Sequence, residues 1–411
     1  MIVFKKVRIP RGDFWLPVDV VVGGGLYAHI GKPGSVRVLE KARIVECEGM
    51  YLIPAPIDPH VHVREPGDDY KEDWVTCSKS ALKGGIGTIF DMPNNRVPIV
   101  DSITLMEKRE IALKKSFSHF GLYIALTDKN GSELMDHLVQ TGVCGVKVYM
   151  HFTTGGLLVK SEDALMLAFK QRRPVLFHTG GPEGLERVLY LYKKAFQTYN
   201  SLPVIYLCHL STSEEVRLIR KWKREYSNIV AEVTPHHLFL THESYRGYRS
   251  VLPPLAGQSD VDALWEGIKD GSIDILGSDH APHTIEEKQS MEPPAGFPGL
   301  ETSLPLIFQA HMDGKLSLGD FSRLMRGKAI EVFNLKEERI IQEGGRADCV
   351  LMEEVEFSVG DGGYETKCGW SPFHGWRLRW KPVMTLLNGN VVYERDVFFK
   401  YPVFDLCCEK I

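Results

Sequence analysis

The sequence predicts an α/β protein in which residues 51–339 form a (β/α)₈ barrel of the TIM type. Residues 1–50 and 340–411 are expected to form a small β-sandwich domain together. Eight short apolar runs in the central region alternate with longer segments of helical spacing, which predicts parallel strands joined by helices. Eight such units can close into a barrel. Strand-like runs punctuated by Gly and Pro occupy both ends of the chain.

The predicted elements follow one another along the chain. The N-terminal strands are expected at 4–9, 18–22, 26–30, 36–39 and 42–47. The barrel strands are expected at 51–59, 87–92, 120–126, 145–150, 174–179, 204–210, 229–235 and 273–280. The helices between them are expected at 70–83, 102–115, 132–141, 161–172, 183–199, 213–226 and 260–270. The C-terminal strands are expected at 347–352, 355–359, 383–387 and 390–393, with a hairpin turn at Asn388-Gly389. Because the sequence has no internal repeat, a doubly wound open sheet is the alternative fold.

The bulk composition excludes several classes of protein. A chain of 411 residues with 44% hydrophobic and 25% charged residues is globular, and its net charge of −4 gives no reason to expect nucleic acid or an anionic membrane as a partner. No apolar run approaches the length of a membrane span, and the N-terminus lacks the apolar region of a signal peptide, so a cytoplasmic protein is expected. Eight cysteines without a CxxC pair are expected to be reduced thiols.

Polar side chains stand at the ends of most predicted strands, where the active sites of such barrels lie. In chain order they are His60 and His62, Asp91 and Asn94, Lys147, His178, His209, Glu232 and Asp279. His60 and His62 point the same way from an extended strand because side chains alternate with period two. A lone His-x-His is more often a surface feature than a metal site, but these residues together predict a metal centre if the barrel closes.

Four histidines and one aspartate are typical ligands of Zn²⁺ at a catalytic site. They are too many for one ion, so two ions with a bridging anion are expected. Lys147 stands where the bridging anion would be needed. A lysine amine that has reacted with CO₂ becomes a carbamate, which carries a negative charge and two oxygens. The alternative for Lys147 is an ordinary buried lysine.

At this point the sequence resembles the amidohydrolase superfamily of cyclic amidohydrolases, and within it the dihydroorotases. The motifs that carry the resemblance are Asp58-Pro-His-Val-His-Val-Arg-Glu-Pro-Gly67, Asp91-Met-Pro-Asn94, Gly145-Val-Lys-Val-Tyr149, Phe177-His178, Cys208-His-Leu-Ser-Thr212, Glu232-Val-Thr-Pro-His-His237, Gly277-Ser-Asp-His-Ala-Pro-His283 and Gly296-Phe-Pro-Gly-Leu-Glu-Thr302. They span the whole predicted barrel.

The resemblance implies a reaction and a ligand set. His60, His62 and Asp279 would hold one zinc, His178 and His209 the other, and carbamylated Lys147 would bridge them. A metal-bound hydroxide would attack the ring amide, with Asp279 as general acid and base. The implied activity is the reversible cyclisation of N-carbamoyl-L-aspartate to L-dihydroorotate in pyrimidine (UMP) biosynthesis.

Substrate recognition is also implied by the resemblance. Arg64, Asn94 and His283 would bind the substrate carboxylate, because a guanidinium recognises a carboxylate through paired hydrogen bonds. The alternative is a hydantoinase or dihydropyrimidinase-like amidase, whose rings lack that carboxylate. Leu252 and Ala256 stand where many dihydroorotases have Asn and Arg, so Leu252 and Ala295 are expected to contact the ring through main-chain groups.

Other expectations concern a loop, an extra metal and partners. Thr153-Thr154 resembles a loop that closes over substrate in some relatives, with an ordinary loop as the alternative. A matching Cys and Glu bind an extra zinc in animal multifunctional relatives, but Cys208 precedes a ligand on its strand and is expected to point away as a core thiol, with Glu232 in a supporting role. A homodimer, a complex with aspartate transcarbamoylase and a catalytically dead partner barrel are further readings; the complete ligand set argues against the last.

Overall fold

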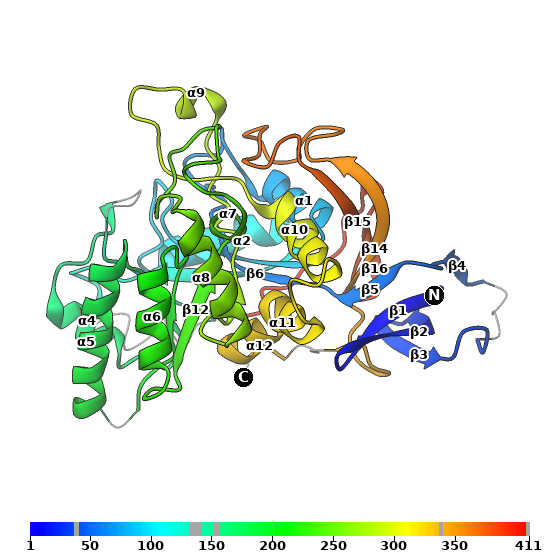
Figure 1. Ribbon diagram of the computed structural model, residues 1–411, viewed down its shortest axis with the longest axis horizontal. Helices are drawn as coiled ribbons and strands as arrows, with labels where there is room; N and C mark the ends of the chain where they lie inside the picture. Colours follow the sequence, from blue (N-terminus) through cyan, green and yellow to red (C-terminus); the bar gives the residue numbers. More distant parts are fainter. Residues whose placement is uncertain (37–40, 132–141, 152–155, 200, 337–339, 408–411) are drawn as a thin grey trace.

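The computed structural model describes residues 1–36, 41–131, 142–151, 156–199, 201–336 and 340–407. Within these ranges the long strands form two sheets (Figure 1). One sheet lies among the helices of the central region, and the other, built from the two ends of the chain, lies to one side. The predicted strand at 36–39, the predicted helix at 132–141 and the Thr153-Thr154 pair lie wholly or mostly outside the described residues.

The central sheet is parallel and has eight strands among the described residues, in the spatial order of the chain. These strands are β6 (Ile57–Val61), β7 (Thr88–Asp91), β8 (His119–Ala125), β9 (Gly145–Tyr149), β10 (Val175–His178), β11 (Ile205–Leu207), β12 (Ile229–Val233) and β13 (Ile275–Leu276). Each lies within or overlaps a predicted strand. Strands such as β12 are buried on both faces, as parallel strands covered by helices require.

The first and last strands meet, so the sheet closes into a barrel. Val61 forms a parallel bridge with His280. The His62 N–H donates to the His280 carbonyl at 2.9 Å. The prediction of an α/β barrel is therefore confirmed, and the open doubly wound sheet is excluded.

Helices cover the outside of the barrel (Figure 1). In the described part of the chain they are α1 (Trp74–Lys83), α2 (Ser102–Lys115), α4 (Glu162–Ala168), α5 (Pro182–Thr198), α6 (Ser213–Trp222), α7 (Pro235–Phe239), α8 (Gln258–Lys269), α9 (Ile285–Lys288), α10 (Leu300–Met312), α11 (Leu318–Ser322) and α12 (Lys328–Phe333), with a π-helical turn η3 (Arg323–Gly327). Local chemistry sets several starts: Asp73, Asp101 and Thr212 each form a capping box at the head of a helix.

The second sheet joins both ends of the chain. Its members in the described ranges are β1 (Ile2–Arg11), β2 (Phe14–Gly23), β3 (Leu26–Gly31), β4 (Arg43–Glu46), β5 (Tyr51–Pro54), β14 (Cys349–Ser358), β15 (Arg377–Leu387), β16 (Asn390–Glu394) and β17 (Val397–Phe398). Strand β5 joins the N-terminal and C-terminal strands of this sheet. It pairs parallel with β1 on one side and antiparallel with β14 on the other. The division into two domains at residues 50 and 340 stays a prediction.

Some strand extents were predicted wrongly. The runs expected at 347–352 and 355–359 are one strand, β14. The run at 51–59 is two strands: β5 belongs to the terminal sheet and β6 to the barrel. Pro54 and Pro56 lie at the junction. Because proline has no N–H to donate to a ladder, the chain changes sheets there.

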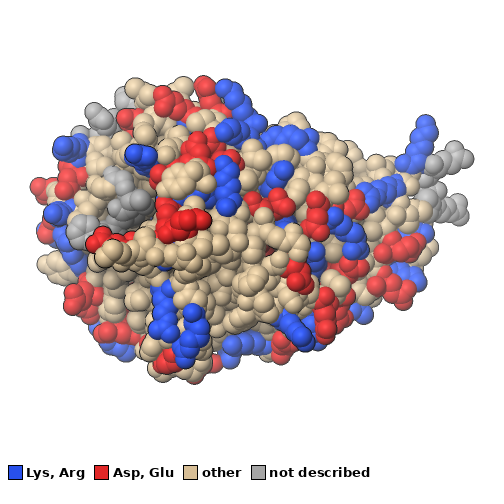
Figure 2. All heavy atoms as spheres, turned by 90° about the horizontal axis from the view of Figure 1, so that it is seen from above, with Lys and Arg blue, Asp and Glu red and all other residues tan. Residues whose placement is uncertain are grey.

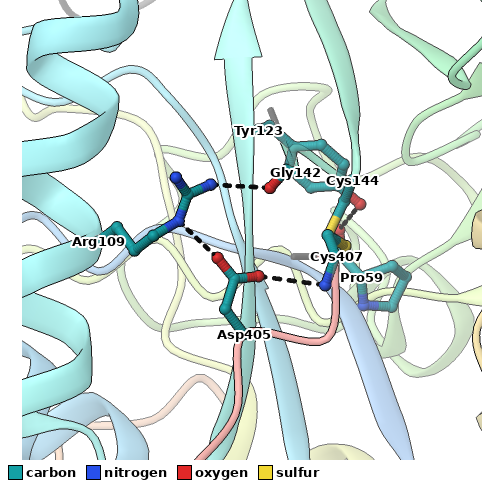
Figure 3. The surroundings of a disulfide bond; sticks show 7 residues. All are labelled: Pro59, Arg109, Tyr123, Gly142, Cys144, Asp405 and Cys407. Atoms are coloured by element: carbon teal, nitrogen blue, oxygen red, sulfur yellow. Dashed lines mark hydrogen bonds and ion pairs between the residues drawn. A yellow bond between two sulfur atoms is a disulfide. The ribbon is translucent and has the colours of Figure 1, made fainter. Parts of the chain in front are cut away.

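The C-terminal segment packs against the amino ends of the barrel strands. The Phe120 N–H donates to the Phe404 carbonyl at 3.0 Å, and the Leu406 N–H donates back to Phe120 at 2.9 Å. Asp405 pairs with Arg109 at 2.8 Å, and Cys407 forms a disulfide with Cys144 (Figure 3).

The expectation of reduced thiols is therefore wrong for this pair. The two cysteines are 263 residues apart in sequence, and only the fold brings their Cα atoms to 5.1 Å. Among the residues the structure describes, the other cysteines are free and buried.

The surface carries both signs of charge. Figure 2 shows lysine and arginine interspersed with aspartate and glutamate over one face, as a net charge near zero predicts. In the described ranges, no helix combines the length and the apolar character needed to cross a membrane.

Candidate active site

A cavity of about 280 Å³ opens at the carboxyl ends of the barrel strands. All the predicted metal ligands and substrate-binding residues line it, whereas Asp91 and Glu232 are buried outside its lining. The lining is His60, His62, Arg64, Asn94, Lys147, Tyr149, His178, His209, Leu252, Asp279, Ala281, His283, Pro294, Ala295 and Gly296. Seven of the eight barrel strands, or the loops that follow them, therefore contribute to the site. Each supplies either a lining group or Glu232, which is hydrogen-bonded to His60.

His60, His62 and Asp279 form one group of possible metal ligands. Their ligand atoms all lie within 4.8 Å of one another. Asp279 Oδ1 is 3.0 Å from His62 Nε2 and 3.3 Å from His60 Nε2. Burial alone would raise the pKa of Asp279, but the neighbouring His60 and His62 hold it well below its ordinary value, so this side chain is a carboxylate at neutral pH.

His178 and His209 form a second pair beside the first group. His178 Nδ1 lies 2.8 Å from His209 Nε2. Among the described residues, neither His178 Nε2 nor His209 Nδ1 has a hydrogen-bond partner. Burial, with the Lys147 charge, lowers the pKa of His178 to about 3, and burial with His178 lowers the pKa of His209. Both imidazoles are therefore neutral, which is the form that binds a metal.

Lys147 is fully buried at the centre of these groups, on β9. Its Nζ donates to Cys208 Sγ at 2.9 Å and lies 5.4 Å from the centre of the Tyr149 ring. A buried ammonium with no carboxylate within ion-pair distance in the described part of the chain is costly. A carbamate formed on this amine would be an anion whose charge metal ions held by the neighbouring histidines would balance, so the surroundings of Lys147 fit a modified, metal-bridging lysine.

The predicted direction of Cys208 was wrong, although its thiol is free and buried in an apolar cluster, as expected of a core thiol. Its side chain faces Lys147, and with His60 and Glu232 it forms a second group of possible ligands. Alternation does not extend to Cys208 because β11 ends at Leu207, and His209 has a left-handed backbone with φ of 39°.

Glu232 connects the two histidine groups. Its Oε1 accepts from His60 Nδ1 and from the His209 N–H, both at 2.8 Å, and its Oε2 accepts from the Tyr206 hydroxyl at 2.6 Å. His60 Nδ1 is thereby occupied, so Nε2 is the nitrogen that faces Asp279 and the cavity.

The predicted substrate ligands are part of the cavity lining. Arg64 is buried with φ of 55°, and its Nη2 lies 3.3 Å from His283 Nε2. Within the described residues, no carboxylate lies at ion-pair distance from this guanidinium, and its Nε has no partner. Asn94 Oδ1 accepts from His62 Nδ1 at 2.6 Å, so Asn94 also orients a possible metal ligand.

Sequence reasoning missed Tyr149. It lines the cavity, its side chain is buried, and its hydroxyl has no partner among the described residues. Tyr149 is two residues after Lys147 on the same strand, so alternation could have placed both on the inner face.

Comparison with known proteins first defines the class. A model of the amidohydrolase family matches residues 51–392. Because this match covers most of the chain, the protein belongs to the amidohydrolase family.

Curated relatives place the chain more closely within that family. The dihydroorotase of Pyrococcus horikoshii is 32% identical over 381 residues, which cover 90% of this chain and 87% of that protein. The dihydroorotase of Methanosarcina acetivorans is 32% identical over 433 residues, covering 95% and 92%. The multifunctional protein CAD of Squalus acanthias is 31% identical over 83% of this chain, but only 15% of that longer protein is matched.

Among solved structures, an L-hydantoinase (dihydropyrimidinase) from Arthrobacter aurescens aligns with a TM-score of 0.88 and 25% identity over 97% of each chain. The fold is therefore shared by amidohydrolases of more than one substrate class, and several of the sequence relatives are named dihydroorotase.

Proposed function

We infer that this protein is a dihydroorotase, which interconverts N-carbamoyl-L-aspartate and L-dihydroorotate. The observation that carries this inference is Arg64, a buried guanidinium on the cavity wall with no carboxylate partner among the described residues. A buried cation of this kind is costly unless a ligand supplies the opposite charge. A substrate carboxylate would do so through two hydrogen bonds.

The donor set fits two divalent metal ions, which we propose to be zinc. His60, His62 and Asp279 would hold one and His178 and His209 the other, with Lys147, as a carbamate, between them. Bound metal ions supply a lowered water pKa and a polarised substrate carbonyl.

Asp279 is the proposed general acid and base. In hydrolysis, a water oxygen bonds to the ring carbonyl carbon, and one water proton passes to an Asp279 oxygen. The ring C–N bond then breaks, and Asp279 returns the proton to the departing nitrogen. In the reverse direction, the carbamoyl nitrogen bonds to the side-chain carboxyl carbon of the aspartate and water leaves. The lowered pKa of Asp279 keeps this side chain ionised at neutral pH.

Five residues are proposed to hold the rest of the substrate. Arg64, His283 and Asn94 would bind the carboxylate that does not react, and Leu252 and Ala295, both in the cavity lining, would offer main-chain groups to the ring. This is the proposed basis of specificity.

The alternative is a hydantoinase, which the structural likeness to the L-hydantoinase favours. Hydantoin rings carry no carboxylate, so that activity would leave the Arg64 charge without a partner. The two functions therefore differ in how they depend on Arg64.

The test follows ring opening of dihydroorotate and ring closure of carbamoyl aspartate by protein loaded with zinc and bicarbonate. We expect Lys147→Ala to lower kcat/KM by about 10³-fold. We expect Arg64→Met to raise KM by about 10²-fold, because a buried charged hydrogen-bond partner is removed. Arg220→Met is the matched control, since Arg220 pairs with Asp270 on the surface.

Hydantoin is the competing substrate in the same assay. Turnover of hydantoin alone, unaffected by Arg64→Met, would establish the amidase alternative. No turnover of either ring at full metal content would leave a non-catalytic partner protein.

We also propose a cytoplasmic location. A homodimer and a complex with aspartate transcarbamoylase stay predictions, to be checked by the mass of the purified protein with and without that enzyme.

A further inference from the structure

His283 stands between two cations and one carboxylate at the edge of the cavity. On one side, Arg64 Nη2 lies 3.3 Å from its Nε2. On the other side, Glu287 Oε2 lies 3.2 Å and Lys71 Nζ 3.5 Å from its Nδ1. Nδ1 thus has both a hydrogen-bond acceptor and a donor within reach.

Arg64 and Glu287 determine the tautomer of the His283 ring when no ligand is bound. A guanidinium can only donate, so His283 Nε2 accepts from Arg64 and carries no hydrogen. The hydrogen of the neutral ring is then on Nδ1, where Glu287 accepts it. Burial and the charges of Arg64 and Lys71 lower the pKa of His283 to about 2, so the ring is neutral at physiological pH.

Binding of a carboxylate next to Arg64 would favour the other tautomer of His283, with the hydrogen on Nε2. A lone pair on His283 Nε2 would face the carboxylate oxygens and repel them. A neutral imidazole can donate to the carboxylate only if the hydrogen moves to Nε2, which leaves a lone pair on the buried Nδ1. That lone pair needs a donor, because a buried polar atom without a partner is costly.

We propose that Lys71 is the positioning residue that stabilises the Nε2–H tautomer of His283 and thereby the substrate-binding state of the ring. This inference rests on the proposed function, in which His283 contacts the substrate carboxylate. The distance of 3.5 Å from Lys71 Nζ to Nδ1 is at the outer limit of a hydrogen bond, and a small movement of the flexible lysine shortens it.

The surroundings hold Lys71 for this role. Its side chain is buried, and its Nζ lies 3.2 Å from Glu287 Oε1 and 3.8 Å from Asp68 Oδ2. Glu287 Oε2 accepts the Thr284 N–H at 3.0 Å, so this oxygen keeps a partner when the hydrogen leaves Nδ1. The contacts join the loop after β6 to the loop after β13, on opposite sides of the barrel seam.

The first measurement is nitrogen NMR of the metal-loaded protein with labelled histidine rings, without and with orotate, a planar carboxylate analogue of the product ring. His283→Gln identifies the His283 signals by their loss. In the wild type we expect orotate to move the hydrogen from Nδ1 to Nε2. In Lys71→Met we expect that exchange to be lost.

The second measurement is steady-state kinetics of the same variants. We expect Lys71→Met to raise KM for dihydroorotate by about tenfold, as for the loss of one hydrogen bond to a charged group, with kcat within about twofold. Lys71→Arg retains a donor and should restore KM to within about threefold of the wild type. Lys83→Met is the matched control. Lys83 Nζ lies 3.3 Å from Glu301 Oε2, and neither residue belongs to the cavity lining.

The outcomes separate this inference from the function on which it rests. If the wild type does not turn over dihydroorotate, the proposed function fails. If the wild type turns it over and His283→Gln weakens orotate binding, but Lys71→Met keeps both the tautomer exchange and KM, the role of Lys71 is refuted. If Lys71→Met lowers kcat as well as raising KM, and Lys71→Arg restores neither, Lys71 has a purely structural role.

Discussion

Glu232 determines how His60 presents itself to the cavity. It holds His60 Nδ1, the His209 N–H and the Tyr206 hydroxyl at once, and it is fully buried. Carboxylates that accept from the second nitrogen of a metal-binding histidine fix its orientation and raise its basicity. The same role explains why a carboxylate at a strand end is not itself part of the cavity lining.

The first prediction at this scale is that Glu232→Gln weakens metal binding by about 10- to 100-fold, because a neutral amide supports His60 less well. Metal content after dialysis against a chelator series measures it directly. Glu215→Gln is the control, since Glu215 is also buried but, among the described residues, accepts from Ser211 and Thr212 just before α6. Equal metal retention in both variants would contradict the role of Glu232.

The site residues differ in how visible they are in the sequence. His60, His62 and Lys147 could be predicted because alternation on a strand places them inward. The direction of Cys208 could not, because it depends on where β11 ends and on the left-handed backbone of His209.

At the scale of elements, helix starts are governed by local side chains. The Asp101 carboxylate accepts from the Thr104 N–H at 2.8 Å, and the Thr104 hydroxyl accepts from the Asp101 N–H. These two hydrogen bonds form a capping box at the start of α2. The hydrogen bond from the Thr104 N–H lowers the pKa of Asp101 below its ordinary value of 3.8.

The second prediction is that Asp101→Ala lowers the free energy of unfolding by about 1 kcal/mol at pH 7. Because the folded-state pKa is depressed, the charge-dependent part of this stabilisation is complete above pH 3.8 and is lost as the pH falls through the lower folded value. Urea unfolding of both proteins at pH 7 and pH 3 measures the difference, which should shrink at pH 3. A difference that grows on acidification would be evidence against it.

At the scale of the whole molecule, the C-terminal segment packs against the barrel and is linked to it covalently. Leu406 and Cys407 pack in the same apolar cluster as Phe333, Tyr123 and Phe90. The disulfide between Cys144 and Cys407 closes a loop of most of the chain, which restricts the unfolded state.

The third prediction is that Cys407→Ser lowers the free energy of unfolding by about 2–4 kcal/mol under oxidising conditions and leaves kcat/KM unchanged, because the disulfide lies at the amino ends of the strands and outside the cavity lining. Calorimetry with and without a reductant measures it. Cys77→Ser is the control, since Cys77 is a free buried thiol. Equal sensitivity of wild type and Cys407→Ser to the reductant would show that the disulfide does not form in solution.

The sequence by itself determined the order of strands and helices and the residues at the strand ends. Apolar runs, helical spacing and capping residues are local signals, and each is complete within a few residues. The tertiary structure alone decided that Cys144 meets Cys407 and that Lys71 reaches His283. These contacts join residues far apart in the chain, and they depend on closure of the barrel, for which no single stretch of sequence carries a signal.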